Sequence, residues 1–234
     1  MSEISDRIAL IREKIAQAAG KSGRNADDVR LLAVSKTFPA ADILDAFQNA
    51  GQLCFGENKV QELDSKVPVL PAGIEWHLIG HLQSNKAVKA AALAHWIHSV
   101  DSEKLIRKLN DVAAKNGKHI KILLEVNLSG EESKSGIRGE DEVFRLAEIL
   151  SPLEFLEFKG FMTMAECDAG ELKIRKTFAA LRELRDRVEN HFSLHLPELS
   201  MGMSGDFEYA IAEGATIVRV GSSIFGHRDY TINA

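Results

Sequence analysis

The sequence predicts an α/β fold in which eight strand–helix units form one (β/α)8 barrel, a TIM barrel, with an extra helix at the N-terminus. Apolar or β-branched runs of strand length recur about eight times in the 234 residues, and helix-like segments separate most of them. This alternation is typical of parallel strands joined by crossover helices. Eight units in roughly 200 residues suit a small barrel, so we expect residues 1–234 to form a single barrel domain.

The expected elements follow the chain in order. Four isoleucines between residues 4 and 15 recur at helical spacing, and Gly20 is placed to end that first helix. The longest later helix is expected near residues 171–190. An open doubly wound sheet is the alternative, but no GxGxxG motif follows the first strand, which disfavours its dinucleotide-binding version. Strands are expected at residues 30–36, 53–57, 75–79, 96–100, 119–128, 155–164, 197–203 and 216–222.

Composition excludes several classes of protein. The net charge is −5, which gives no reason to expect nucleic acid or an anionic membrane as a partner. Cys54 and Cys167 form no CxxC motif, which fits a reducing compartment. The N-terminus lacks the apolar stretch of a signal peptide, and no apolar run reaches membrane-spanning length. We therefore expect a cytoplasmic protein, and we expect it to be monomeric.

The stretch "RLLAVSKT" places a lysine, Lys36, at the end of the first apolar run. The active sites of such barrels lie at the C-terminal ends of the strands. Because inward-facing residues alternate, Leu32, Val34 and Lys36 should share the inner side. A partly desolvated lysine amine at the barrel mouth is a good nucleophile toward aldehydes. A surface lysine beyond the strand end is the alternative interpretation.

Polar residues also follow other strands. In "FGEN", Asn58 could bind a ligand oxygen or cap a helix that starts at Lys59. His77 and His81 are four residues apart, but we expect no metal site, and these histidines should belong to the core or to a pocket. The polar, glycine-containing segment 129–142 is expected to be a mobile loop at the barrel mouth.

The last two strands run into small residues that suit a phosphate. Ser204 and Gly205 precede a helix, and Gly221 and Ser222 follow the last strand. Barrels often bind phosphate with the loops after strands seven and eight. Arg219 lies two positions before Gly221, so both should face the same side. Tight turns that require glycine are the alternative.

A lysine amine, a phosphate-binding loop pair and an inward arginine would together suit an aldehyde that carries a phosphate. Pyridoxal 5′-phosphate has both groups, and its ring nitrogen needs a partner. A Schiff-base aldolase acting on sugar phosphates is a second candidate. In familiar aldolase barrels the Schiff-base lysine lies on a late strand rather than on the first. Here the only lysine of the sixth strand run, Lys159, lies near the start of that run.

Six motifs carry a resemblance to a known family: "LLAVSKT", "FGENKVQE", "WHLIGHLQSNK", "FMTM", "MGMSGDFEYAI" and "VRVGSSIFG". Between about Ala33 and Phe225, in order and at similar spacing, they resemble the pyridoxal phosphate homeostasis proteins (the YggS/PROSC family). The resemblance implies a fold-type III pyridoxal phosphate barrel, similar to the N-terminal domain of alanine racemase. Phe38 departs from the pattern, because some relatives have a polar or basic residue there.

The resemblance also implies roles for particular residues. Lys36 would form the Schiff base, Ser204, Gly221 and Ser222 would hold the phosphate, Arg219 would face the pyridine nitrogen, and Asn58 and Met203 would line the ring pocket.

The family resemblance further implies a protein that binds pyridoxal phosphate in the cell, buffers or delivers it to apo-enzymes, and has no robust catalytic activity. An arginine beside the pyridine nitrogen disfavours protonation of that nitrogen, which fits this role. An amino-acid racemase that uses the same cofactor is the alternative. In alanine racemase a second acid/base group comes from a C-terminal domain, and we expect none here because only eight residues follow Gly226.

Overall fold

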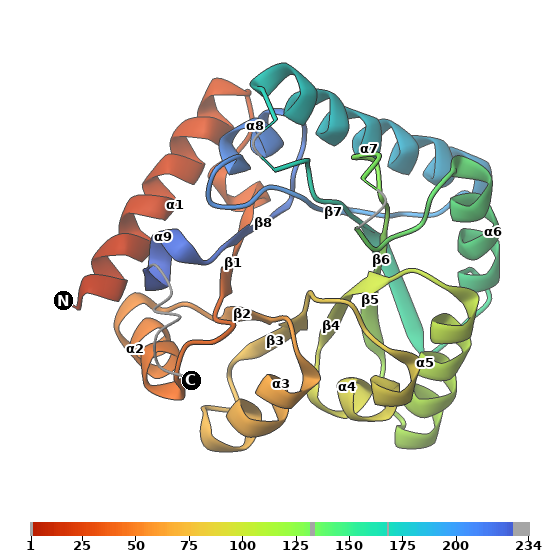
Figure 1. Ribbon diagram of the computed structural model, residues 1–234, viewed down its shortest axis with the longest axis horizontal. Coiled ribbons are helices and arrows are strands. Elements are labelled where there is room, and N and C mark those ends of the chain that lie inside the picture. Colours follow the sequence, from red (N-terminus) through yellow and green to blue (C-terminus); the bar gives the residue numbers. More distant parts are fainter. Residues whose placement is uncertain (1, 132–133, 168, 227–234) are drawn as a thin grey trace.

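Eight parallel strands form a closed barrel in the computed structural model, which describes residues 2–131, 134–167 and 169–226 (Figure 1). Each strand pairs with the next along the chain, and the last pairs with the first. The predicted barrel is therefore confirmed, and the open sheet is excluded. The strands are β1 (Arg30–Val34), β2 (Cys54–Glu57), β3 (Glu75–Leu78), β4 (Trp96–Val100), β5 (Ile120–Glu125), β6 (Leu156–Met162), β7 (Glu198–Ser200) and β8 (Ile217–Val220).

Helices surround the barrel on its outside (Figure 1). Within the described ranges, none of them is both long enough and apolar enough to cross a membrane. They are α1 (Glu3–Lys21), α2 (Ala40–Ala50), α3 (Val60–Lys66), α4 (Ala87–Leu93), α5 (Glu103–Asn116), α6 (Glu140–Leu150), α7 (Glu171–Phe192), α8 (Phe207–Ala212) and α9 (Ser222–Phe225), with 3-10 turns at Ala26–Asp28, Val67–Val69 and Ser84–Lys86.

The predicted N-terminal helix is α1, which packs against α2, α8 and α9. It covers the side of the barrel where β8 meets β1, because α9 has only four residues and cannot cover that side alone (Figure 1). The predicted helix end at Gly20 was wrong, since Gly20 lies inside α1. The chain turns at Gly23 instead, whose φ of +68° is a left-handed conformation suited to glycine.

Most strands end earlier than the sequence predicted. β1 ends at Val34 rather than at residue 36, and β8 ends at Val220 rather than at residue 222. The Ser35 amide still donates to the Gly56 carbonyl over 3.0 Å, but the backbone turns at Thr37, whose φ is +72°. The predicted strands are too long because buried apolar residues, such as Val126 after β5 and Met201 after β7, continue past the strand ends. A buried residue gives the same apolar pattern whether or not it pairs in a strand.

The interior of the barrel is unusually polar for a core. Between the strands and the helices the buried residues are mainly apolar. Inside the barrel a small cluster of Trp96, Leu123 and Met162 is accompanied by buried His77 and His98, and by other buried polar side chains. A buried polar group is tolerated only when it has hydrogen-bond partners. The partners that these side chains need inside the barrel therefore restrict which residues can stand next to them.

A bulge in β6 brings two backbones very close together. The register with β5 shifts between Ile122 and Leu123, whose partners are Phe158 and Gly160. Gly160 has φ +145°, and a Cβ added to it would lie 1.9 Å from the Glu198 carbonyl oxygen of β7. Only glycine fits at this position.

Replacing Gly160 by alanine should therefore lower the free energy of unfolding by about 2–4 kcal/mol, because β6 and β7 must separate and the backbone is strained. The matched change Gly20→Ala, at a helical glycine with open space around it, should raise it by about 0.5–1 kcal/mol. Urea unfolding of both variants measures this difference. A Gly160→Ala variant as stable as the original protein would contradict the bulge geometry.

Candidate functional site at the barrel mouth

A cavity of about 590 Å³ opens at the C-terminal ends of the strands. This volume lies within the range of pockets that bind small molecules. All seven residues that the sequence predicted for the site line it: Lys36, Asn58, Met203, Ser204, Arg219, Gly221 and Ser222.

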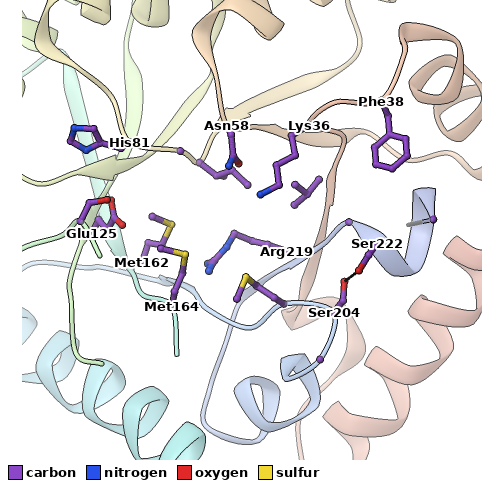
Figure 2. A pocket seen from close by; sticks show the side chains of 18 residues that line it. Lys36, Phe38, Asn58, His81, Glu125, Met162, Met164, Ser204, Arg219 and Ser222 are labelled. Atoms are coloured by element: carbon purple, nitrogen blue, oxygen red, sulfur yellow. Dashed lines mark hydrogen bonds between the residues drawn. The ribbon is translucent and has the colours of Figure 1, made fainter. Parts of the chain in front are cut away.

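Figure 2 shows how the side chains lie around this cavity. Lys36 and Arg219 occupy its middle, and the Ser204–Ser222 pair lies to one side of them. His81 and Glu125 lie on the opposite side. The cavity therefore has one end formed by hydroxyl groups and glycines and another end formed by titratable side chains.

Lys36 lies in a turn directly after β1. The Phe38 amide donates to the Ser35 carbonyl over 3.1 Å, which closes the turn around Lys36. The Thr37 amide donates to Glu62 Oε2 over 2.6 Å, which holds the left-handed Thr37 in place. The residues on both sides of Lys36 are thus fixed, and its side chain points into the cavity (Figure 2).

A buried charged cluster of Ser35, Glu57, Glu62 and Lys66 supports this turn from behind. The Lys66 ammonium donates to Glu57 Oε1 over 2.7 Å, to the Ser35 carbonyl over 3.0 Å and to Glu62 Oε2 over 3.1 Å. The Ser35 hydroxyl donates to the same Glu57 oxygen over 2.7 Å. Sequence reasoning missed this cluster, although a glutamate inside the apolar run "CFGE" and a Glu–Lys pair four residues apart were visible signals.

Burial dominates the electrostatics of Glu57 in this cluster. It raises the pKa of Glu57 to about 7, although Lys66 and Ser35 act in the opposite direction. The second carboxylate oxygen of Glu57 has no hydrogen-bond partner among the described residues. Lys66 is therefore the group that does most to stabilise the ionised form of Glu57.

The loops after β7 and β8 meet at one side of the cavity. The Ser222 hydroxyl donates to the Ser204 hydroxyl over 3.2 Å. Gly221 lies so close to β1 that an added Cβ would be 3.1 Å from the Val34 carbonyl oxygen. The Asp206 carboxylate accepts from the Met203 amide over 2.5 Å, which fixes the first loop.

These loops present backbone donors that the protein does not use. Within residues 2–131, 134–167 and 169–226, the amide groups of Ser204, Gly205, Ser222 and Ser223 donate to no acceptor. Four free N–H groups beside two hydroxyls form a site suited to an anion with several oxygens, such as a phosphate.

Arg219 is the buried cation of the site, and only 4% of its surface is exposed. Its Nη1 donates to the Ser200 hydroxyl over 2.8 Å, and its Nη2 donates to the Thr163 carbonyl over 2.9 Å. Burial lowers the pKa of Arg219 to about 10, while Asp206 and Glu125 oppose that shift. Arg219 thus stays a cationic donor at neutral pH.

The other candidates divide between cavity and core. Asn58 lines the cavity, and the capping interpretation is wrong, because Lys59 occupies the N-cap of α3 and no side chain caps it. Phe38, the departure from the family pattern, packs on Phe225 with 5.1 Å between ring centroids. His81 lines the cavity, whereas His77 is buried inside the barrel.

The loop predicted at residues 129–142 does reach the mouth, since Ser135 lines the cavity. Its described part is anchored, because the side-chain amide nitrogen Nδ2 of Asn127 donates to the Glu131 and Lys134 carbonyls over 2.9 and 3.1 Å. Residues 132–133 lie outside the described residues, and the mobility of the loop stays a prediction.

Glu125 at the end of β5 is a site residue that sequence reasoning missed. Its side chain lines the cavity and is nearly fully buried. One of its carboxylate oxygens has no partner among the described residues. Burial raises its pKa to about 7, Asp101 adds to this shift, and Arg219 opposes it.

Comparison with known proteins places the chain in a family. The model of the alanine racemase N-terminal domain matches residues 8–229. The pyridoxal phosphate homeostasis protein of Vibrio alginolyticus is 44% identical over 237 residues, which cover 99% of this chain and 100% of that protein. The chain belongs to the pyridoxal phosphate homeostasis protein family. The expectation drawn from the six sequence motifs is thereby confirmed.

Solved structures agree with this family membership. The structure of PipY from Synechococcus elongatus PCC7942 without pyridoxal phosphate is 38% identical, with a TM-score of 0.87 over 95% of this chain and 100% of PipY. The structure of PipY with pyridoxal phosphate bound gives a TM-score of 0.84. Alanine racemase of Clostridium difficile 630 is 14% identical with a TM-score of 0.75, over 97% of this chain and 58% of that one. That last likeness shows a shared barrel fold alone.

In this member of the homeostasis protein family, Lys66→Ala should lower the free energy of unfolding by about 3–5 kcal/mol, since it leaves Glu57 buried without its cation. Lys89→Ala is the matched control, because Lys89 pairs with Asp64 over a similar 2.6 Å but at the surface. That change should cost less than about 1 kcal/mol. Equal losses in denaturant unfolding would show that the buried cluster has no special role.

Glu125 should make the stability of the protein fall as pH rises. Its ordinary pKa is 4.5 and its folded-state pKa is about 7. Between these values the folded state binds a proton that the unfolded chain has released, so the folded state loses stability with rising pH. Relative to the original protein, Glu125→Gln should gain up to about 3 kcal/mol between about pH 4.5 and about pH 8.

Unfolding curves across this pH range measure the gain. The exposed Glu154→Gln should follow the original protein in parallel. A Glu125→Gln variant that also stays parallel would mean that the pKa of Glu125 is the same in the folded and unfolded states.

Proposed function

We propose that this protein binds pyridoxal 5′-phosphate in the cavity at the barrel mouth and takes part in homeostasis of that cofactor by holding and passing it on, without robust catalysis. The observation that carries the proposal is the convergence of an amine, a guanidinium and an anion-binding loop pair on one cavity. Relatives named pyridoxal phosphate homeostasis proteins, and PipY with pyridoxal phosphate bound, support it.

The residues present fit the cofactor's phosphate. The hydroxyls of Ser204 and Ser222 are already paired at 3.2 Å, and the unused N–H groups of these loops lie beside them. Gly221 would present its backbone to the phosphate from the cavity wall, and its lack of a side chain lets this loop lie close against Val34 of β1. Charge-assisted hydrogen bonds from several donors would share the phosphate's negative charge.

The residues also fit the ring and the aldehyde. When bound, pyridoxal phosphate supplies an aldehyde that condenses with a primary amine, and Lys36 would supply that amine by Schiff-base formation. Arg219 would hold the ring nitrogen by donating a hydrogen bond to it. Asn58 and Met203 would line the space around the ring.

Arg219 also argues for binding rather than catalysis. A guanidinium does not give up its proton at neutral pH, and a second positive charge beside it is unfavourable. Arg219 would therefore keep the ring nitrogen unprotonated. The racemase alternative requires a further acid/base group, and the titratable side chains at the far end of the cavity, Glu125 and His81, are the candidates that an amino-acid activity assay would test.

We further propose that the protein acts as a cytoplasmic monomer that passes the cofactor to apo-enzymes. Within the described part of the chain, the large exposed apolar side chains belong to different elements and connecting segments: Leu10, Leu53, Val69, Val88, Leu172 and Met203. Stable partner interfaces usually need a contiguous patch. Met203 is also exposed at the cavity, which suits a cofactor that must leave.

Reductive trapping tests the proposal. The protein is loaded with pyridoxal phosphate, reduced with borohydride and digested, and the pyridoxyl adduct should be found on Lys36. Lys36→Ala should lose this adduct and the visible absorbance, whereas the exposed neighbour Lys59→Ala should keep both. An adduct found only on other lysines would contradict the proposed site.

The phosphate contacts are tested by comparing ligands. Pyridoxal without phosphate should bind about 100-fold more weakly or worse, because several charged hydrogen bonds are lost. Equal affinities for the two ligands would rule out the proposed phosphate site.

A further inference from the structure

A line of hydrogen-bonded side chains crosses the inside of the barrel and ends at Arg219. It begins at Glu75, at the start of β3 and thus at the N-terminal face, opposite the cavity. His77 Nε2 lies 3.0 Å from Glu75 Oε1, and His77 Nδ1 lies 2.9 Å from His98 Nε2. His98 Nδ1 lies 3.0 Å from the Ser200 hydroxyl, which accepts from Arg219 over 2.8 Å. We call these five residues the barrel chain.

With both rings neutral, the carboxylate end fixes the direction of every bond in the barrel chain, and the guanidinium end is compatible with it. A guanidinium can only donate, and a carboxylate can only accept. Because the Ser200 oxygen accepts from Arg219, its own hydroxyl hydrogen is free to point to His98 Nδ1. His98 then carries its hydrogen on Nε2 and donates to His77 Nδ1. His77 likewise carries its hydrogen on Nε2 and donates to Glu75.

The charges of the barrel chain agree with this direction. Burial lowers the pKa of His77 to about 4, against the opposing effect of Glu75. Burial also lowers the pKa of His98 well below its usual value, and His77, Arg219 and Arg30 add to that shift. Both rings are therefore neutral at physiological pH. The hydrogen bond from His77 lowers the pKa of Glu75 to about 2, so the acceptor end stays ionised.

Neighbouring groups hold the rings in place. The Trp96 indole stacks on the His77 ring, with 5.4 Å between centroids and 5° between planes. The Trp96 Nε1 donates to Glu75 Oε1 over 2.6 Å. Arg30 lies 3.7 Å from the same carboxylate. Arg30 also acts on both histidines, and His95 acts on His77; each lowers the pKa of the ring it faces.

A metal site at the same place fits less well. Ligand atoms of Cys54, Glu75 and His77 lie within 4.8 Å of one another. Both nitrogens of His77 are already hydrogen-bonded, however, and burial raises the pKa of Cys54 to about 11, which keeps its thiol protonated. Protonated thiols and occupied imidazoles are poor ligands.

We propose that Glu75, His77, His98 and Ser200 are positioning residues that hold Arg219 in one orientation through a one-way hydrogen-bond chain. The Ser200 hydroxyl and the Thr163 carbonyl each take one donor of the guanidinium. The remaining donors can then face the cavity, which Arg219 lines. The effect of this orientation on a bound cofactor rests on the proposed function, whereas the hydrogen bonds of the barrel chain do not depend on that function.

The proposal links two distant places in the fold. A change at Glu75, on the N-terminal face of the barrel, should alter the tautomers of His77 and His98 and the direction of the Ser200 hydroxyl beside Arg219, because each ring can reverse its bonds only together with its neighbour. Replacing Glu75 by glutamine removes this constraint, since an amide can donate as well as accept. The histidines could then adopt the opposite tautomers.

Nitrogen-15 NMR of the histidine rings in the protein without cofactor tests the chain directly. In the original protein His77 and His98 should both be neutral with hydrogen on Nε2. Glu75→Gln should populate the form with hydrogen on Nδ1 in both rings. Glu198→Gln, the matched control on the same face and also paired with Arg30, should leave both rings unchanged. A charged ring or an Nδ1–H tautomer in the original protein would overturn the proposal.

A second measurement uses the loaded protein. Ser200→Ala breaks the chain beside Arg219 and should weaken pyridoxal phosphate binding about tenfold, with a changed absorption spectrum. Ser5→Ala removes another buried serine, on α1, whose side chain does not line the cavity and bonds to the Asn49 carbonyl instead, and should change neither. Unchanged affinity and spectrum in a folded Ser200→Ala variant would overturn the positioning role. If the original protein binds no cofactor, the proposed function fails. The tautomers measured by NMR would still show whether the hydrogen bonds of the barrel chain run in the proposed direction.

Discussion

The burial of the Arg219 guanidinium inside the barrel is the constraint on which the arrangement of the site depends. A buried cation without acceptors would cost several kcal/mol, so the surrounding strands must provide them. Ser200 of β7 and the Thr163 carbonyl after β6 do so directly. Ser200 in turn needs its own partner, which is His98 of β4. One buried charge thus determines side chains on several strands and explains why the inside of this barrel is polar.

The Lys36 turn is supported in a different way. Its supports come from β2 and α3, through the buried contact between Glu57 and Lys66 and through the bond from the Thr37 amide to Glu62. These contacts lie behind the turn, whereas the support of Arg219 lies beneath the cavity. The amine and the guanidinium are therefore held by two separate sets of buried polar contacts. A cavity fixed from two sides needs little rearrangement when a ligand enters, which favours binding.

The loops that complete the site follow the general logic of barrels. The strands supply a rigid frame, and the residues just beyond their C-terminal ends supply the chemistry. In this chain the loops after β7 and β8 offer unused donors, and the end of β5 offers Glu125. The likeness to alanine racemase extends to the barrel alone. The proposed function therefore depends on the family relatives and on the cavity itself rather than on the fold.

The sequence by itself determined the barrel, the N-terminal helix and the seven candidate residues at the cavity. It could do so because strand–helix alternation, and short motifs at strand ends, are local in the chain. Only the tertiary structure decided which buried polar groups meet, since a contact such as His98 with Ser200 joins residues 102 positions apart. It also decided the protonation of Glu125, because the pKa of a carboxyl group depends on its burial and not on its position in the sequence. Hydrogen bonds and desolvation depend on distances between strands, and those distances exist only once the barrel has closed.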